Sequence, residues 1–387
     1  MVLAGLLASL ACGPASTTAM AQPYVPPHGQ VFAGLSGGTS VLPYERMVAK
    51  HPPVFEDYTT WGTSTAWLAS PDSSFRSRLG LEISTGTGYA KPGVISPEGI
   101  ALGRSDGFLT ALNANLARSG RIVYVRIMGE VNGYWNAYSA FSADGQRRGV
   151  QNSPHFFVQA WRRAVLILRG GPVIGIDRRL RALGLASVRG VPRARHLPRP
   201  KVAFLWVPQD AGSPPIAANA PAVYWPGGEY VDWVGTDFYA SYANFGLLDR
   251  FYAEFAGKPF VLSEWALYGA DDPGFVRALF AWVRTHRRVR MLDYYQGFTR
   301  ASPANLARYP RSRAALARAL HSRRFLAYPP EYAHAHHRRT RPGPPPRPPK
   351  PGLPPGPAPG APPGPAPAPG GAPPLVCVTP LFCVPTL

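Results

Sequence analysis

The segment RIVYVRIMGEVNGYW, from Arg121 to Trp135, contains the most informative pattern in this 387-residue chain. Its first half, Ile122–Met128, is almost continuously apolar, as expected of a parallel strand that is covered on both faces. Glu130 follows this run closely, so its carboxyl is buried on the strand side and open on the other. Burial of that kind raises the pKa of a carboxyl group and suits it to donate a proton near neutral pH.

Seven further segments have a similar strand-like character, and amphipathic stretches lie between them. Ser105, Ser153-Pro154 and Asp272-Pro273 are typical helix starts, and Gly120 is a typical helix end. The predicted strands are Val31–Leu35, Val54–Thr59, Leu79–Ser84, Ile122–Met128, Val202–Val207, Val231–Phe238, Phe260–Ser263 and Val289–Tyr295.

Strands that alternate with helices over residues 30–327 predict an α/β protein with a (β/α)8 (TIM) barrel. A doubly wound sheet is the alternative, but no G-x-G-x-x-G motif opens a helix after the first strand. In a barrel, the reacting residues lie where strands end. The residues that follow each strand are therefore the candidates for a functional site.

Two glutamates occupy such positions. Glu130 follows the fourth predicted strand, and Glu264 ends the seventh. Either alone is equally consistent with a structural ion pair, but a pair across one barrel mouth is typical of glycoside hydrolysis. One carboxyl protonates the leaving oxygen, and the other attacks the anomeric carbon or activates water. A separation of about 5–5.5 Å predicts retention of configuration, and about 6.5–9.5 Å predicts inversion.

Aromatic residues near these glutamates are suited to stack on sugar rings. The alternative for each of them is packing in the core, which applies most strongly to Trp206 because it lies inside a predicted strand. These residues are Trp135, Trp206, Tyr239 and Trp265.

The stretch from Val31 to about Phe298 resembles glycoside hydrolase family 26, the retaining β-mannanases of the large (β/α)8 clan. The family's Arg-x-x-His-Glu-Met-Asn-Gly-x-Trp segment is matched here by Arg126, Glu130, Asn132, Gly133 and Trp135. Its sixth-strand block is matched by Pro226-Gly227 and by Tyr230-Val231-Asp232-Trp233-Val234-Gly235-Thr236-Asp237-Phe238-Tyr239, and Trp206 precedes it as the family's fifth-strand tryptophan does.

The resemblance implies that Glu130 is the acid/base, Glu264 the nucleophile, and Tyr239 the hydroxyl that orients the nucleophile. No cofactor is expected, and no cluster of ligand residues in the sequence calls for a metal. The substrate contacts expected on this basis are Arg126, Asn132, Trp135, Trp206, Asp237, Tyr239 and Trp265.

Three positions depart from the family pattern. Gly129 stands where the family has a histidine that touches the substrate near the cleaved bond. Trp265-Ala-Leu-Tyr268 follows Glu264 in place of small residues, and Tyr294-Tyr295-Gln296 stands where a tryptophan is common. The substrate therefore remains open between β-mannan and a related β-glucan or xylan.

The two ends of the chain differ from the middle. The apolar run Val2–Ala11 and the triplet Ala19-Met20-Ala21 are typical of a secretory signal, so we expect residues 1–21 to be removed and the protein to be secreted. A disordered N-terminus is the alternative. Residues 328–387 are rich in Pro, Arg and His and are expected to be disordered, ending in a small disulfide loop between Cys377 and Cys383.

The chain has 41 Lys and Arg against 21 Asp and Glu, a formal net charge of +20. Much of the excess lies in residues 176–201, 284–327 and the tail, without the interleaved aromatic residues of a nucleic-acid-binding module. We therefore expect no nucleic-acid partner, and expect anionic cell-wall polymers as partners of the basic tail. Beyond the N-terminus no apolar run is long enough to span a bilayer, and we expect a monomer.

Three functions fit these patterns. The first is a secreted retaining β-glycoside hydrolase that acts on a polysaccharide by double displacement. The second is a catalytically weak or inactive carbohydrate-binding protein associated with the cell wall, which the glycine at position 129 favours. The third is an envelope protein in which the arginines act and the barrel is incidental.

Overall fold

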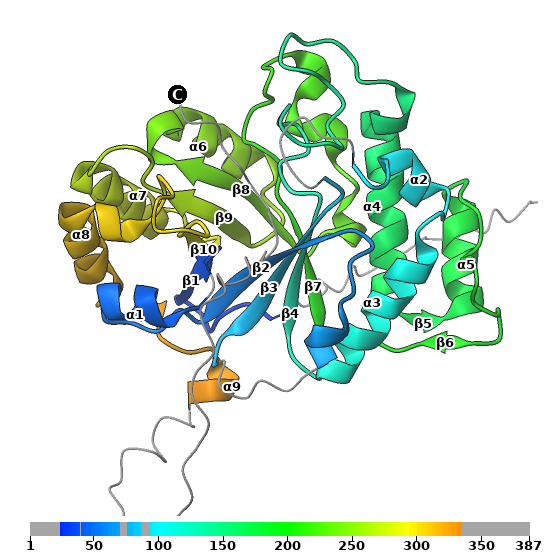
Figure 1. The fold of residues 1–387 in the computed structure, drawn as a ribbon, viewed down its shortest axis with the longest axis horizontal. Helices are drawn as coiled ribbons and strands as arrows, with labels where there is room; N and C mark the ends of the chain where they lie inside the picture. The colour runs from blue at the N-terminus through cyan, green and yellow to red at the C-terminus, as the bar shows by residue number, and fades with distance from the viewer. Residues whose placement is uncertain (1–23, 39, 70–75, 87–92, 334–387) are drawn as a thin grey trace, which may run out of the picture.

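The computed structural model describes residues 24–38, 40–69, 76–86 and 93–333. Its centre is a ring of eight parallel strands, in which β10 pairs with β1 and so closes the barrel (Figure 1). The strands are β1 (Val31–Ser36), β2 (Val54–Thr60), β3 (Arg78–Ser84), β4 (Val123–Ile127), β7 (Val202–Trp206), β8 (Trp233–Tyr239), β9 (Phe260–Ala266) and β10 (Val289–Tyr295). The predicted (β/α)8 fold is confirmed, and the closed ring excludes the doubly wound sheet, which has two open edges.

The helices lie outside the ring, as Figure 1 shows. They are α1 (Leu42–Val48), α2 (Pro97–Ala101), α3 (Asp106–Ser119), α4 (Pro154–Arg169), α5 (Val173–Ala182), α6 (Phe245–Glu254), α7 (Pro273–Thr285), α8 (Pro310–Leu320) and α9 (Pro330–Ala333). Short 3₁₀ helices lie at Ala66–Ala69 (η1), Val150–Asn152 (η2), Ala217–Asn219 (η3), Pro221–Tyr224 (η4), Gly228–Tyr230 (η5), Ala240–Tyr242 (η6) and Leu306–Arg308 (η7). Outside the ring, β5 (Gly171–Pro172) pairs with β6 (His196–Leu197), and β11 (Phe325–Leu326) pairs with β1.

The helix ends follow the sequence with one exception. Ser153 and Asp272 each precede a proline at the start of a helix, and each side chain accepts a backbone N–H of the first turn. Ser105 also precedes its helix, but its hydroxyl makes no such bond and is buried without a partner. Gly120 ends that helix at a φ of 64°, where glycine has no steric cost.

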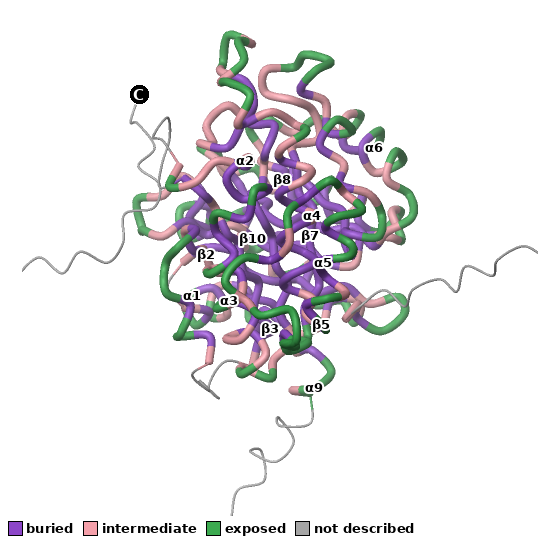
Figure 2. Tube along the Cα trace, turned by 90° about the vertical axis from the view of Figure 1, so that its right-hand side faces the viewer, coloured by how far each residue is buried: buried purple, intermediate pink, exposed green. Residues whose placement is uncertain are grey.

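The side chains inside the barrel change from apolar to charged along the strands. On β2 the inward positions are Val54 and then Glu56, and on β4 they are Tyr124 and then Arg126, because alternate residues of a strand share a face. The apolar part of the interior consists of Phe32, Val54, Tyr124, Ala203, Leu205, Val207, Trp233, Val261 and Met291. A larger apolar cluster lies between the strands and the helices. The strands of the ring are mostly buried (Figure 2), and β1, β4, β7 and β9 are buried at every residue.

The N-terminal end of the barrel is closed by a buried arginine. Arg78, which is 5% exposed, donates Nε and Nη2 to the Glu331 carboxylate at 2.8 and 2.9 Å. Its Nη1 donates to the Tyr124 hydroxyl at 2.7 Å and to the Tyr24 carbonyl at 2.6 Å. Glu331 belongs to α9, so residues 328–333, which the sequence assigns to the tail, include contacts with the barrel.

Several expectations fall on residues that the structure does not describe. The signal segment 1–21, the tail from 334 onward and the pair Cys377 and Cys383 lie outside the described residues. Within the described part of the chain, no helix has both the length and the apolar character needed to cross a membrane.

Replacement of Glu331 by glutamine should destabilise the fold, because the buried Arg78 guanidinium loses its carboxylate partner. Loss of a charged hydrogen-bond partner costs about 1–3 kcal/mol, so the urea midpoint should fall. Glu229→Gln is the matched control. Glu229 pairs with Arg179 while the two side chains are 61% and 46% exposed, and such a pair contributes less than about 1 kcal/mol. Equally small losses in both variants would show that the Arg78 contact does not hold the barrel end.

Candidate active site

Glu264 lies at the C-terminal end of β9 and is bound by three donors. Its Oε1 accepts from Arg126 Nη1 at 2.9 Å and from the Tyr58 hydroxyl at 2.8 Å, and its Oε2 accepts from the Tyr239 hydroxyl. The backbone N–H of Glu264 donates to Asp237 Oδ1 at 2.9 Å. With 8% of its surface exposed, Glu264 has a fixed orientation and accepts hydrogen bonds through both of its oxygens.

A β-bulge in β9 turns Glu264 toward the interior. The pairing with β8 shifts by one residue after Leu262, which leaves Ser263 as the extra residue. Val261 belongs to the apolar interior and Ser263 also faces inward. Regular alternation would therefore point Glu264 outward. The extra residue lets Ser263 and Glu264 both face the inside of the barrel.

Arg126 is 1% exposed and is surrounded by acidic side chains. Its Nη1 lies 2.9 Å from Glu264, 3.1 Å from Glu82 and 3.9 Å from Glu56. Its Nη2 donates to Asp237 at 2.5 Å. One guanidinium cannot neutralise four carboxylates in a buried site.

The acidic neighbours of Arg126 have raised pKa values. Burial raises the pKa of Glu56 to about 7, and it raises the pKa of Glu82 and that of Asp237 well above their ordinary ranges. In each case the charge of Arg126 opposes this effect, and the charge of Glu264 adds to it. These carboxyl groups therefore bind protons more tightly than carboxyl groups in water do.

Glu130 lies at the rim of the barrel in a left-handed backbone conformation, with a φ of 50°. Such a conformation is unfavourable for a residue with a side chain and persists where the surroundings impose it. Here the N–H of Glu130 donates to the Val207 carbonyl at 2.7 Å. Its Oε2 accepts from Trp135 Nε1 at 2.7 Å, and its Oε1 accepts from the side-chain amide of Gln209.

The pKa of the Glu130 carboxyl is raised above its ordinary value. Burial is the largest cause and the charge of Glu264 is the next. Arg126 and hydrogen bonds with Trp135 and Asp237 oppose the rise. The influence of Glu264 on this pKa places the two carboxyls in one electrostatic site. Two carboxyl groups whose surroundings differ in this way can divide the roles of acid and nucleophile.

Asn132 has no exposed surface and binds the backbone of Gln209, the residue whose side-chain amide contacts Glu130. Its Oδ1 accepts the backbone N–H of Gln209 at 2.8 Å, and its Nδ2 donates to the Gln209 carbonyl at 3.1 Å. Asn132 was expected to contact the substrate. The structure instead uses it to hold the residue that binds Glu130.

Gly133 leaves room for Trp135, since a Cβ atom at position 133 would lie 2.4 Å from the indole. The indole therefore packs over the loop backbone while its N–H reaches Glu130. Trp135 is partly exposed beside this carboxyl.

Two tryptophans expected at the sugar site lie elsewhere. Trp206 and Trp265 are each 1% exposed and belong to the core between the strands and the helices. Trp206 packs on Trp225 and Phe255 with ring centroids 4.9 and 4.8 Å away, and Trp265 packs on Tyr294 at 5.0 Å. Both expectations are corrected, because these side chains point away from the barrel axis.

Arg126 and Asp237 were also expected to contact the substrate. Arg126 is 1% exposed and Asp237 is 5% exposed. The two side chains bind each other, and both also bind Glu264. Both side chains therefore contact Glu264, and their low exposure leaves little surface for direct contact with a substrate.

Tyr58, Tyr268 and Tyr295, which the sequence did not assign to the site, form an aromatic cluster with Tyr239, whose hydroxyl binds Glu264. Tyr58 lies with its ring centroid 5.4 Å from Phe298 and 6.4 Å from Tyr295, and Tyr295 lies 6.2 Å from Tyr239. Tyr239 also lies 6.0 Å from Tyr268. The signal for Tyr58 was present in the sequence, since it follows Val54 and Glu56 at the inward spacing of two. The same spacing identifies the inward positions of β3, including Glu82.

The absence of a side chain at Gly129, where family 26 has a histidine, has a structural reason. A Cβ atom at this position would lie 2.2 Å from Arg126 Nε and 2.6 Å from Arg126 Nη2. The guanidinium therefore occupies the space that a side chain at 129 would need. A histidine at this position would require Arg126 to move away from its carboxylate partners.

A group of three carboxylates has oxygen atoms within 4.8 Å of one another, contributed by Glu56, Glu82 and Glu264. This group is the one candidate metal cluster among the described residues. Arg126 Nη1 lies 2.9–3.1 Å from two of these carboxylates. The guanidinium thus supplies one positive charge to this cluster.

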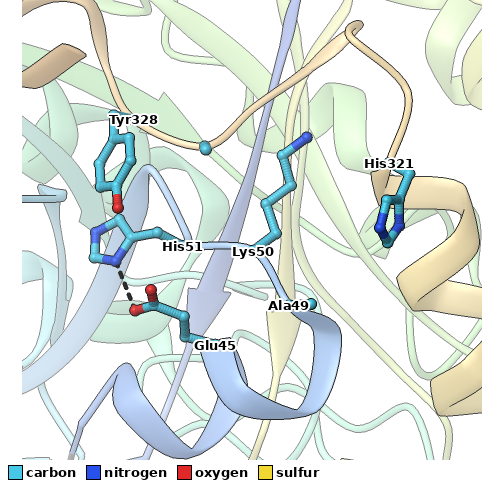
Figure 3. Close-up of a pocket in the computed structure, with 7 residues that line it drawn as sticks. Glu45, Ala49, Lys50, His51, His321 and Tyr328 are labelled. Carbon is cyan, nitrogen blue, oxygen red and sulfur yellow. Dashed lines mark hydrogen bonds and ion pairs between the residues drawn. The ribbon is translucent and has the colours of Figure 1, made fainter. Parts of the chain in front are cut away.

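A pocket of about 430 Å³ lies at the opposite end of the barrel, beside the start of β2 (Figure 3). There His51 lies 2.9 Å from Glu45 and 3.0 Å from Ser77. A serine, a histidine and a carboxylate are thus linked as they are in a Ser-His-Asp catalytic triad. Ser77 has no exposed surface, however, and also donates to the Pro52 carbonyl at 2.6 Å. Its hydroxyl cannot reach a substrate, so this group is structural and joins β2 to Tyr328, whose ring stacks on His51.

Comparison with solved structures supports the fold. The catalytic domain of the family 26 endo-β-1,4-mannanase of Bacillus sp. JAMB-750 matches with a TM-score of 0.51 at 12% identity, covering 77% of this chain and 87% of that one. A modular family 26 endo-β-1,4-mannanase from Cellulomonas fimi matches with a TM-score of 0.51 at 14% identity, covering 77% and 72%. No family model and no curated protein sequence matches the chain. The resemblance to family 26 is thus confirmed at the level of the fold.

Substitution of Gly129 by alanine should destabilise the protein, because the added methyl group collides with the Arg126 guanidinium. Overpacking of a buried site costs about 1–3 kcal/mol, measured as a lower denaturant midpoint. Gly107→Ala is the control: Gly107 lies in α3, and nothing lies within 4 Å of its Cβ position. Alanine there should stabilise the helix by about 0.5–1 kcal/mol. If Gly129→Ala were as stable as the parent, Arg126 would not occupy the position described.

Proposed function

We propose that this protein is a secreted glycoside hydrolase that cleaves a β-linked polysaccharide with retention of configuration. The observation that carries the proposal is the contrast between Glu130 and Glu264 at one end of the barrel. The pKa of Glu130 is raised, as suits a proton donor, whereas Glu264 is held in one orientation by three side-chain hydrogen bonds, as suits a nucleophile. This pairing matches the requirements of double displacement.

In the first step, Glu264 attacks the anomeric carbon and forms a covalent glycosyl-enzyme, while Glu130 donates its proton to the departing oxygen. In the second step, Glu130 takes a proton from water, which displaces the sugar from Glu264. Tyr58, Tyr239 and Arg126 hold the Glu264 carboxylate in place. Their hydrogen bonds limit its rotation, so less ordering is needed when the substrate binds.

The same site and the fold support a proposal for the substrate class. β-Mannan is the first candidate, because the solved structures of the same fold include endo-β-1,4-mannanases. A related β-glucan or xylan is the second, because Gly129 lacks the family's histidine. The partly exposed indole of Trp135 beside Glu130 is suited to stack on a sugar ring. The N-terminal signal segment supports secretion, and the basic tail supports contact with anionic wall polymers.

Glu130→Gln and Glu264→Gln should each abolish the release of new reducing ends from the polysaccharide that the parent cleaves. Loss of acid/base catalysis alone lowers the rate about 10²–10⁴-fold, and loss of the nucleophile prevents the covalent intermediate. The screen should include mannans, β-1,3/1,4-glucans and xylans. Glu254→Gln is the control, since Glu254 is exposed at the end of α6, remote from the site.

Pull-down on the same polymers separates catalysis from binding. Retained binding with no cleavage of any polymer by the parent would favour the carbohydrate-binding alternative that Gly129 suggests. Hydrolysis that persists in either glutamine variant would reject the assignment of Glu130 and Glu264.

Trp135→Phe should move the alkaline limb of the kcat/KM profile to higher pH. The indole N–H lowers the pKa of Glu130 by binding its ionised form. Its removal raises that pKa, so the acid keeps its proton to a higher pH. A profile whose alkaline limb is unchanged or shifts downward would show that Glu130 is not the titrating acid.

A further inference from the structure

A line of oxygen atoms runs from the middle of the barrel interior to Glu264. Glu56 Oε2 lies 2.9 Å from Ser36 Oγ, Ser36 Oγ contacts the Tyr58 hydroxyl, and that hydroxyl lies 2.8 Å from Glu264 Oε1. The four residues come from β1, β2 and β9, which the closed barrel brings together. No sequence motif links them.

The number of protons in this line can be counted. Each of its three oxygen–oxygen contacts needs one proton to be a hydrogen bond. Ser36 and Tyr58 carry one hydroxyl proton each, which satisfies two contacts. The third proton must therefore reside on one of the two carboxyl groups at the ends, Glu56 or Glu264.

The contacts at the two ends decide where that proton resides. Glu264 Oε1 also accepts from Arg126 Nη1 at 2.9 Å, and its other oxygen accepts from Tyr239. Both oxygens of Glu264 are therefore already used as acceptors. Glu56 is 2% exposed and lies 3.9 Å from Arg126, beyond hydrogen-bond distance.

The remaining contacts of Glu56 are compatible with a protonated carboxyl group. Its second oxygen, Oε1, accepts from Ser263 Oγ at 3.3 Å, so a proton on Oε2 leaves every contact satisfied. Gly80 makes room for the side chain, since a Cβ atom there would lie 2.9 Å from the Glu56 Cβ. Burial raises the pKa of Glu56 to about 7. The charged or titratable groups that influence Glu56, or are influenced by it, are Tyr58, Glu82, Arg126, Glu264 and Asp293.

We propose that Glu56 is a positioning residue that holds a proton in the barrel interior and, through Ser36 and Tyr58, orients the Tyr58 hydroxyl toward Glu264. The hydrogen bonds then run in one direction, from Glu56 to Ser36, to Tyr58 and to Glu264. The neutral Glu56 also removes one negative charge from the neighbourhood of Arg126. This inference rests on the proposed role of Glu264 as the nucleophile.

Titration of the Glu56 carboxyl carbon by ¹³C NMR, in the intact protein without substrate, tests the proposal. The resonance is assigned by its absence from Glu56→Gln. We expect a midpoint near 7, well above the ordinary value of about 4.3 for glutamate. A midpoint near the ordinary value would overturn the proposal, because Glu56 would then be ionised where the line requires its proton.

Tyr58→Phe distinguishes the hydrogen-bonded line from simple burial. Without the Tyr58 hydroxyl, Ser36 is free to donate to an ionised Glu56, so the midpoint should fall relative to the parent. Tyr295→Phe serves as the control, since Tyr295 contacts the ring of Tyr58 but is not part of the line. An unchanged midpoint in Tyr58→Phe would show that burial alone holds the proton and that the line is not coupled.

The pH dependence of stability gives a second readout. Because Glu56 binds its proton more tightly when folded, the parent should lose stability relative to Glu56→Gln as pH rises from about 4.5 to about 7. The difference between the urea midpoints of the two proteins should change over that range and stay constant above it. A constant difference throughout would contradict the proposal.

Hydrolysis provides the link to function. An amide can donate to Ser36 as a protonated acid does, so Glu56→Gln should retain more activity than Glu56→Asp. An ionised Glu56 would give the reverse order. The titration and stability measurements use no substrate. If they succeed while no polymer is cleaved, the proposed function fails but the proton at Glu56 stands.

Discussion

The contact between the buried Arg126 guanidinium and the carboxylates around it is the interaction on which the site depends. The guanidinium lies 2.9 Å from Glu264, 3.1 Å from Glu82 and 2.5 Å from Asp237, and Arg126 is 1% exposed. A buried charge is costly unless it is paired, and here the excess of acid over base forces some carboxyls to remain protonated. The distribution of protons in the barrel interior is thus a consequence of having one cation among several acids.

The barrel tolerates Arg126 and the acidic side chains around it because apolar side chains fill the rest of its interior and cover its outer surface. The inner apolar cluster fills the N-terminal half of the barrel, and the outer cluster joins the strands to the helices. Glycines leave the space that the polar groups need. A Cβ at Gly34 would lie 2.1 Å from Asp293, and one at Gly129 would lie 2.2 Å from Arg126. The absence of a side chain at these positions is therefore part of the site.

The fold was predictable from the chain because most strands are short apolar runs and amphipathic helices lie between them. Glu130 and Glu264 were identified by their positions at the ends of strands. Trp206 and Trp265 were assigned to the sugar site because they are aromatic and lie at or near strand ends, but they face the helices. Glu56 and Glu82 were overlooked because a charged residue within a strand has no motif of its own, although its inward spacing is regular.

The amino-acid sequence by itself determined the number of strands, the barrel and the ends of strands at which the two glutamates lie, because hydrophobic periodicity and helix-start residues are local properties. Only the tertiary structure decided which side chains meet. The bulge at Ser263 turns the Glu264 side chain from the outside of the barrel to the inside. The backbone conformation of Glu130 depends on its hydrogen bond to the Val207 carbonyl. Arg126 contacts acidic side chains that come from separate strands. These are contacts between distant segments, and they exist only once the ring has closed.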